Sequence, residues 1–250
     1  MSDFSRAGTV LSGYHNIRDL GGHPLPEGGH TAPNVFWRGD ACRGLDTDGL
    51  RALLDAGLTA ILDLRSHHEV EEAPNPLAEH DGVTYRHLPL YDGLATIDVM
   101  ARSHPEGFDM GRRYQVALDD CAPAFAEALT WLADAGADGA TLFHCTAGKD
   151  RTGLMAALLL GNAGVQADDV VADYAMTATY GRGLIDVLRE KARARGADPD
   201  HSERVLGSRA ETMQATLEWL DATHGGAATY IGKIGVAPEV QERLRTLLTG

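Results

Sequence analysis

The chain has 250 residues, of which 44% are hydrophobic and 23% charged, and its formal net charge at pH 7 is −14. This length and composition suit one large domain, and the negative charge argues against nucleic acid or an anionic membrane as a general partner. No apolar run approaches the roughly 18 residues of a membrane-spanning helix, and the first residues lack a signal-peptide pattern. Three cysteines are a sparse, odd set that fits a reducing compartment, so we expect a cytoplasmic protein, with leaderless secretion left open.

Strands and helices are expected to alternate over the first two thirds of the chain. Short apolar runs predict strands at residues 35–38, 58–64, 83–88 and 139–144. Apolar periodicity and capping residues predict helices at 46–56, at 122–135 and from the last of these strands to about residue 162. Weak periodicity over 91–113 predicts a mobile loop or lid.

The last third has helical patterns throughout. The predicted helices cover residues 168–179, 182–195, 210–223 and 238–248. The whole order indicates an α/β fold with a central, mainly parallel sheet flanked by helices. We expect a single domain over residues 1–250 with a helical lid or insertion within about 165–207. Positive charge gathers at 181–207, which is typical either of a solvated helix face or of a lid over an anionic substrate.

The segment His-Cys-Thr-Ala-Gly-Lys-Asp-Arg-Thr-Gly, residues 144–153, is the most informative part of the sequence. Cys145 and Arg151 have five residues between them, and the segment joins a predicted strand to a predicted helix. Such a loop gathers backbone N–H groups at a helix N-terminus and so cradles an anion. A thiol at its start is expected to ionise readily, and Arg151 can bind two phosphate oxygens at once. His144 is expected to order the loop by hydrogen bonding.

These residues predict a phosphatase that forms a cysteinyl-phosphate on Cys145. Arg151 and the loop amides would hold the phosphoryl oxygens in the transition state, and a hydroxyl at Thr152 could stabilise the sulfur as leaving group. The residues expected to bind the substrate phosphate are Thr146, Ala147, Gly148, Lys149 and Thr152. A magnesium-dependent nucleotide loop is excluded because Asp150 follows Gly148-Lys149 where serine or threonine is needed.

No metal or cofactor is expected, because no metal-ligand spacing occurs. The cluster closest to one, residues 67–69, is interpreted as a solvated helix start. Asp63 and Arg65, at the end of a predicted strand, are expected to buttress the loop. Either spare cysteine, Cys42 or Cys121, could also trap an oxidised Cys145.

Two charged loop residues allow more than one interpretation. Lys149 could bind phosphate or lie in solvent. Asp150 could pair with Arg151 as a structural ion pair, or it could protonate the leaving oxygen. Asp92, Asp98 and Asp109 are alternatives for that acid on a separate loop, with Asp92 ahead of the other two.

The loop resembles the signature of the atypical bacterial tyrosine phosphatase family. Further stretches resemble that family in order along the chain: residues 16–22, 37–40, 61–66, 173–177 and 230–236. Gly39 departs from the more usual serine. The resemblance implies the fold of the cysteine-loop phosphatases, helical insertions over the site, and Asp150 as the general acid, with Asp92 as the runner-up.

The sequence therefore predicts a protein tyrosine phosphatase, with dual specificity left open. Its expected partners are a phosphorylated protein or a phosphoinositide, with the phosphate in the active site. Phosphotyrosine leads over phosphoinositide because Thr146, directly after the cysteine, is uncharged. A phosphate-binding module without turnover is one alternative, which the presence of Cys145, Arg151 and Thr152 together disfavours. Sulfur transfer through a persulfide at Cys145 is a weaker one, because the Lys-Asp-Arg-Thr end of the segment suits dianionic phosphate better.

Overall fold

The computed structural model describes residues 16–43, 46–95, 97, 99–100 and 107–250. Its sheet runs in the order β1-β2-β5-β3-β4, with β1 antiparallel to β2 and the other neighbours parallel. The strands are β1 (Arg18–Asp19), β2 (Phe36–Gly39), β3 (Leu58–Asp63), β4 (Thr84–His87) and β5 (Ala140–His144). This arrangement confirms the mainly parallel sheet predicted from the sequence.

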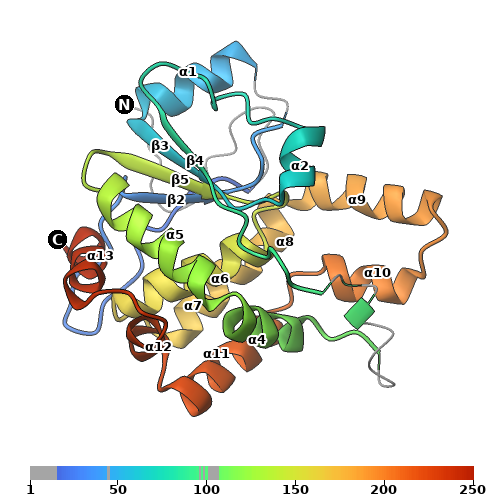
Figure 1. Ribbon diagram of the computed structural model, residues 1–250. Coiled ribbons are helices and arrows are strands. Elements are labelled where there is room, and N and C mark those ends of the chain that lie inside the picture. The colour runs from blue at the N-terminus through green and yellow to red at the C-terminus, as the bar shows by residue number, and fades with distance from the viewer. Residues whose placement is uncertain (1–15, 44–45, 96, 98, 101–106) are drawn as a thin grey trace.

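Helices cover both faces of the sheet (Figure 1). They are α1 (Thr47–Asp55), α2 (His67–Glu72), α4 (Met110–Asp120), α5 (Ala122–Ala135), α6 (Asp150–Asn162), α7 (Ala167–Ala175), α8 (Thr177–Tyr180), α9 (Arg182–Ala194), α10 (Pro199–Leu206), α11 (Ala210–His224), α12 (Ala227–Lys233) and α13 (Pro238–Thr249). Helix α1 lies on one face and α5, α6 and the C-terminal helices on the other. Within the described residues, no helix is long and apolar enough to cross a membrane.

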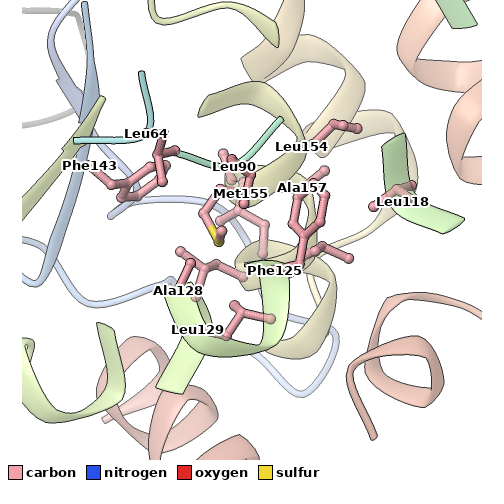
Figure 2. Packing of buried hydrophobic residues seen from close by; sticks show 14 of the residues in the cluster. Leu64, Leu90, Leu118, Phe125, Ala128, Leu129, Phe143, Leu154, Met155 and Ala157 are labelled. Carbon is pink, nitrogen blue, oxygen red and sulfur yellow. The ribbon is translucent and has the colours of Figure 1, made fainter. Parts of the chain in front are cut away.

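The central strands are buried on both faces because their side chains alternate between two cores. Leu62 and Phe143 belong to the larger core, while their neighbours Ile61 and Leu142 belong to the smaller one under α1. In the larger core, Phe143 of β5 lies near Met155 of α6 and the side chains of α5 (Figure 2). This packing fixes β5 and α6, the two elements that the Cys145–Lys149 segment joins.

Most predicted elements are found within one or two residues of their expected ends. The prediction of a loop over 91–113 is wrong at its end, because α4 begins at Met110 with Asp109 as its N-cap; residues 96, 98 and 101–106 lie outside the described residues. The helix predicted over 168–179 divides into α7 and α8 at Met176. Helices α10 and α12 were not predicted, since both are short and α10 has only partly buried or exposed residues.

Helices α9 and α10 form an arm that extends beyond the other helices in Figure 1. Arg189 of α9 donates to Glu203 of α10 at 2.6 Å, and the His201 ring meets Phe108 edge-on at 5.7 Å between centroids. The predicted helix at 182–195 is thus confirmed as one half of this arm, within the segment expected to form a lid.

Candidate active site

The candidate site lies at the carboxyl end of β5, in the middle of the sheet. His144 ends β5 opposite Gly39 of β2 and Asp63 of β3 in the strand register. The following residues, 145–149, form a tight connection before α6 begins at Asp150. We call residues 144–151 the Cys145 loop. Its position matches the expected place for a ligand in a parallel α/β sheet.

Three successive carbonyl groups of the Cys145 loop, at residues 146–148, accept hydrogen bonds from outside the loop. The donors are, in order, the backbone N–H of Ala41 (3.3 Å), the side-chain amide of Asn16 (2.9 Å) and the guanidinium of Arg38 (2.8 Å). The backbone N–H groups of residues 146–149 donate to no other group in the described part of the chain. Because the carbonyl groups point away from the centre of the loop, these N–H groups are available to bind an anion, as in other backbone anion-binding nests.

Gly148 makes this tight path possible. Its φ is +66°, which a side chain disfavours. A Cβ there would also come within 2.6 Å of the Gly39 backbone and 2.8 Å of the Asn16 amide nitrogen. The loop therefore requires glycine at this position both for its conformation and for its close approach to β2.

Arg151 makes a forked contact with Glu69, in the first turn of α2. Its Nη1 donates to Oε2 at 2.6 Å and its Nη2 to Oε1 at 2.8 Å. Glu69 also accepts the hydroxyl of Thr146 and the backbone N–H of Ser66, the latter as part of a capping box. The interpretation of residues 67–69 as a solvated helix start was right about the helix and wrong about Glu69, which is only 26% exposed.

The contact between Glu69 and Arg151 favours the ionised form of both side chains. Burial alone would raise the pKa of Glu69, but the hydrogen bonds and charge of Arg151 outweigh it and hold that pKa well below its usual range. Burial would lower the pKa of Arg151, yet Glu69 and the charge of a Cys145 thiolate raise it above its usual value. Both groups thus stay ionised.

Cys145 itself is 1% exposed and packs in the larger core. Thr152, the predicted donor to its sulfur, is fully buried and its hydroxyl has no hydrogen-bond partner among the described residues. Its role toward the sulfur stays a prediction. Cys42 belongs to the smaller core and Cys121 to the larger, and all three thiols are free.

Asp150 and Lys149 have different partners from those considered in the sequence. The Asp150 carboxylate accepts the hydroxyl of Tyr114 at 2.6 Å and lies 3.2 Å from the Lys149 ammonium. The ion pair considered between Asp150 and Arg151 is not formed; Arg151 pairs with Glu69 instead. A role of Asp150 in proton transfer stays a prediction.

Lys149 is 1% exposed, so the alternative of a solvated lysine is wrong. Its ammonium donates to the carbonyl groups of Val205 and Gly207. These residues end α10 and begin the connection to α11, so Lys149 fastens the arm to the Cys145 loop. A direct contact of Lys149 with phosphate stays a prediction.

The buttress expected from Asp63 and Arg65 is present beneath the loop. Their side chains form a buried ion pair at 2.5 Å, and Asp63 also lies 3.6 Å from the imidazole of His144. His144 further contacts the amide of Asn75 at 2.8 Å. Burial lowers the pKa of His144 despite the nearby Asp63, so a neutral imidazole orders the loop from below.

A second buried ion cluster holds the other side of the loop. Asp173 of α7 accepts from Arg18 at 2.8 Å and from Arg38, and Arg38 in turn holds the Gly148 carbonyl. Arg18 also donates to the side chain of Asn16. The sequence placed these residues in motifs of the resembling family but gave them no role, because nothing local shows that four distant segments meet here.

A cavity of about 470 Å³ opens beside Arg151 and Asp150. Its lining residues are Ser66, Glu69, Tyr91, Leu94, Ile97, Met110, Arg113, Asp150 and Arg151. The size is typical of small-molecule sites. Asp92, the runner-up acid, and Asp109 are both exposed and line no part of it, and Asp98 lies outside the described residues.

A model of the tyrosine phosphatase family matches residues 9–250, almost the whole chain. The chain belongs to that family. It is 34% identical over 247 residues to a tyrosine-protein phosphatase of Nostoc commune, covering 90% of this chain and 82% of that protein. It is 28% identical over 280 residues to the triple specificity protein phosphatase PtpB of Mycobacterium tuberculosis, covering 96% and 98%.

A crystal structure of P. aeruginosa TpbA matches with a TM-score of 0.36 and 16% identity, over 68% of this chain and 84% of that one. Membership of the tyrosine phosphatase family confirms the family and enzyme class predicted from the sequence: the chain is a hydrolase that takes a phosphorylated substrate and binds its phosphate. No cluster of three or more potential metal ligands occurs in the described residues.

Proposed function

We propose that this tyrosine phosphatase acts through a cysteinyl-phosphate formed on Cys145. The observation that carries the proposal is the Cys145 loop itself. Its carbonyl groups at residues 146–148 accept hydrogen bonds from outside the loop, and its N–H groups at 146–149 donate to no group in the described residues. Arg151, at the end of the loop, is held by Glu69. Phosphate is the anion whose size and charge suit such a ring of amides facing a guanidinium.

In the first step, the Cys145 thiolate attacks phosphorus and an Sγ–P bond forms as the bond from phosphorus to the leaving oxygen breaks. The loop N–H groups of Thr146, Ala147, Gly148 and Lys149, with Arg151, hold the equatorial oxygens where charge spreads. Glu69 occupies the Nη1–Nη2 end of Arg151, which leaves the Nε side of the guanidinium for phosphate.

Asp150 is the general acid in this proposal. It lines the same cavity as Arg151, and its bond from Tyr114 fixes its position. It gives its proton to the leaving oxygen in the first step. In the second step it takes a proton from water as the water attacks phosphorus, the Sγ–P bond breaks and the thiolate is restored. Thr152 would stabilise that thiolate as it leaves.

We propose phosphotyrosine in proteins as the main substrate, with phosphoserine and phosphothreonine secondary. Apolar groups of Tyr91, Leu94, Ile97 and Met110 line the cavity beside Arg151, and they suit an aromatic ring. A phosphoinositide is the alternative substrate. The net charge of −14 disfavours an anionic membrane surface. We propose a cytoplasmic site of action, which the sparse, free cysteines support.

We further propose that α9 and α10 act as a lid within the single domain. Lys149 connects the Cys145 loop to the end of α10 by two hydrogen bonds, so this end of the arm is held next to the site. Deleting residues 182–207 is expected to raise turnover of small phosphate esters or to speed inactivation by peroxide. A deletion protein that still melts cooperatively and shows neither change would contradict the lid.

Turnover of p-nitrophenyl phosphate tests the chemistry. The Cys145→Ser variant is expected to lose turnover while still binding a phosphotyrosine peptide. Arg151→Lys should lose most of its activity because an ammonium group cannot make the paired hydrogen bonds of a guanidinium group. Vanadate should inhibit the wild type and EDTA should not. Turnover that survives in Cys145→Ser would overturn the proposed nucleophile.

A further inference from the structure

Arg113 is a buried arginine that the catalytic scheme above does not use. It lies on α4, is 8% exposed and lines the cavity that Arg151 and Asp150 also line. Its neighbour on the helix, Arg112, is exposed to solvent. The two adjacent arginines thus have opposite environments, and only Arg113 belongs to the site.

The direct contacts of Arg113 include no carboxylate, although Asp150, which lines the same cavity, acts on its charge from farther away. Its Nη1 donates to the Ala95 carbonyl at 2.6 Å and lies 3.0 Å from the sulfur of Met100, and its guanidinium stacks on Tyr91 at 5.6 Å from the ring centroid. None of these groups is ionised, and Arg113 forms no ion pair within the described ranges. A buried cation without a partner is costly.

The other buried arginines in the described part of the chain all pair with a carboxylate. Arg18 and Arg38 pair with Asp173, and Arg65 pairs with Asp63. Arg113 departs from this rule, and its burial lowers its pKa. The absence of a carboxylate paired directly with this arginine, at the wall of a cavity, indicates that an anion from outside completes the site.

Tyr91 links Arg113 to the phosphate site. Both guanidinium groups make cation–π contacts with its ring: the guanidinium carbon lies 5.6 Å from the ring centroid for Arg113 and 5.8 Å for Arg151. The two guanidinium groups therefore cannot be farther apart than these two distances together. One substrate can reach both, with its phosphate at Arg151, an aromatic ring along the apolar wall and a second negative group at Arg113.

We propose that Arg113 is a subsite for a second negative charge on the substrate, and that it selects phosphotyrosine with an acidic residue next to it in sequence. The proposal rests on the proposed function and adds the substrate class. A peptide is favoured over a lipid headgroup because Leu94, Ile97 and Met110 supply an apolar wall and because the protein's negative charge opposes an anionic bilayer.

The test compares two phosphotyrosine peptides that differ only in glutamate or glutamine beside the phosphotyrosine. For the wild type, kcat/KM for the glutamate peptide should exceed that for the glutamine peptide by about tenfold, the effect of one charge-assisted hydrogen bond. The ratio should fall toward one in Arg113→Gln and be intermediate in Arg113→Lys. Arg112→Gln, which removes the same charge from the exposed neighbour, should keep the wild-type ratio.

Each outcome bears on the proposal. Equal kcat/KM for the two peptides with the wild type, or an unchanged ratio in a folded Arg113→Gln, would overturn it. So would a short-chain phosphoinositide with two phosphates that outperforms the acidic peptide and depends on Arg113. Binding of both peptides to Cys145→Ser, followed by fluorescence anisotropy, gives the same comparison without turnover. A failure of catalysis is thereby separated from a failure of the subsite.

Discussion

Glu69 and Arg151 form the contact that prepares the site for phosphate. The carboxylate holds one end of the guanidinium and the Thr146 hydroxyl, so the arginine is oriented before substrate arrives. Preorganised donors of this kind need little rearrangement as charge develops. Glu69 therefore acts as a positioning residue for Arg151 and not as a competitor of phosphate.

Glu69→Gln distinguishes these two roles. Loss of the charged partner should let Arg151 move and lower kcat/KM for p-nitrophenyl phosphate by roughly 10- to 100-fold, the range of a charge-assisted hydrogen bond. Steady-state kinetics with vanadate inhibition measures it, and Glu72→Gln on the same helix, whose carboxylate lies near His68, serves as the control. If Glu69→Gln instead gains activity and binds vanadate more tightly, Glu69 blocks the site.

Asp150 should control the pH dependence of the reaction. A general acid must carry its proton in the first step, so Asp150→Asn should flatten the change of kcat/KM between acidic and neutral pH. The effect should be larger for phenyl phosphate, whose leaving group needs a proton more than p-nitrophenolate does. Asp92→Asn is the matched control; if Asp92→Asn flattens the profile and Asp150→Asn does not, the assignment of the acid is wrong.

Gly148→Ala tests the path of the loop. The new Cβ meets the Gly39 backbone at 2.6 Å and sits at φ +66°, so we expect a loss of stability of about 2 kcal/mol or more together with lost turnover. Gly82→Ala is the control: its φ is +89° with no atom within 4 Å of the added Cβ, and it should cost about 1 kcal/mol. Urea unfolding compares the two, and equal losses would contradict the role given to Gly148.

At the scale of elements, the loop depends on segments far apart in the sequence. Arg38 of β2 and Asn16, which precedes β1, donate to loop carbonyls directly. Asp173 of α7 and Arg18 of β1 act through these two side chains. Helix α2 reaches the loop through Glu69. The loop is thus held from both sides of β5, and its conformation belongs to the assembled sheet.

Asp173→Asn should show this dependence. Without the carboxylate, two buried guanidinium groups lose their shared counter-charge, so stability should fall by about 3–5 kcal/mol. Activity should fall as well, because Arg38 also holds the Gly148 carbonyl. Asp168→Asn, on the exposed first turn of the same helix, should cost under about 1 kcal/mol. A folded Asp173→Asn with wild-type kcat/KM would contradict the proposed support.

Local patterns predicted the elements of this fold well and its contacts poorly. The strand before Cys145 and the helix after it follow from apolar periodicity and from the spacing of 144–153, which local chemistry controls. Glu69 could have been noticed as the second half of a Ser66-x-x-Glu69 capping box, but its contact with Arg151 spans 82 positions. The burial of Lys149 and Arg113 depends on α10 and α4, two helices that the sequence did not predict.

At the scale of the whole molecule, buried ionised groups should make stability depend on pH. Burial alone would raise the pKa of Asp63, but the charge that His144 gains only at low pH and the Arg65 guanidinium hold it at about 2. Arg18 and Arg38 likewise outweigh burial and hold the pKa of Asp173 well below its usual range. The contribution of such carboxylates is fully present above the pKa of the unfolded chain, about 4, and is lost as the pH falls toward the folded value.

Unfolding by urea at several pH values measures this dependence. The free energy of unfolding should begin to fall below about pH 6.5, where His144 is neutral in the folded protein but gains a proton when unfolded. It should fall more steeply below about pH 4, where Asp63, Glu69 and Asp173 resist protonation only in the folded state. Constant stability between pH 5 and pH 3 would contradict the buried ion pairs.

The most direct test of the account is to find the phosphoryl group on the enzyme. Wild-type protein mixed with p-nitrophenyl phosphate, quenched with acid within one turnover and digested, should yield a phosphorylated peptide whose modified residue is Cys145, formed in step with the first release of p-nitrophenolate. A phosphoryl group on another residue, or normal release with no modified Cys145 peptide at any quench time, would contradict the central claim.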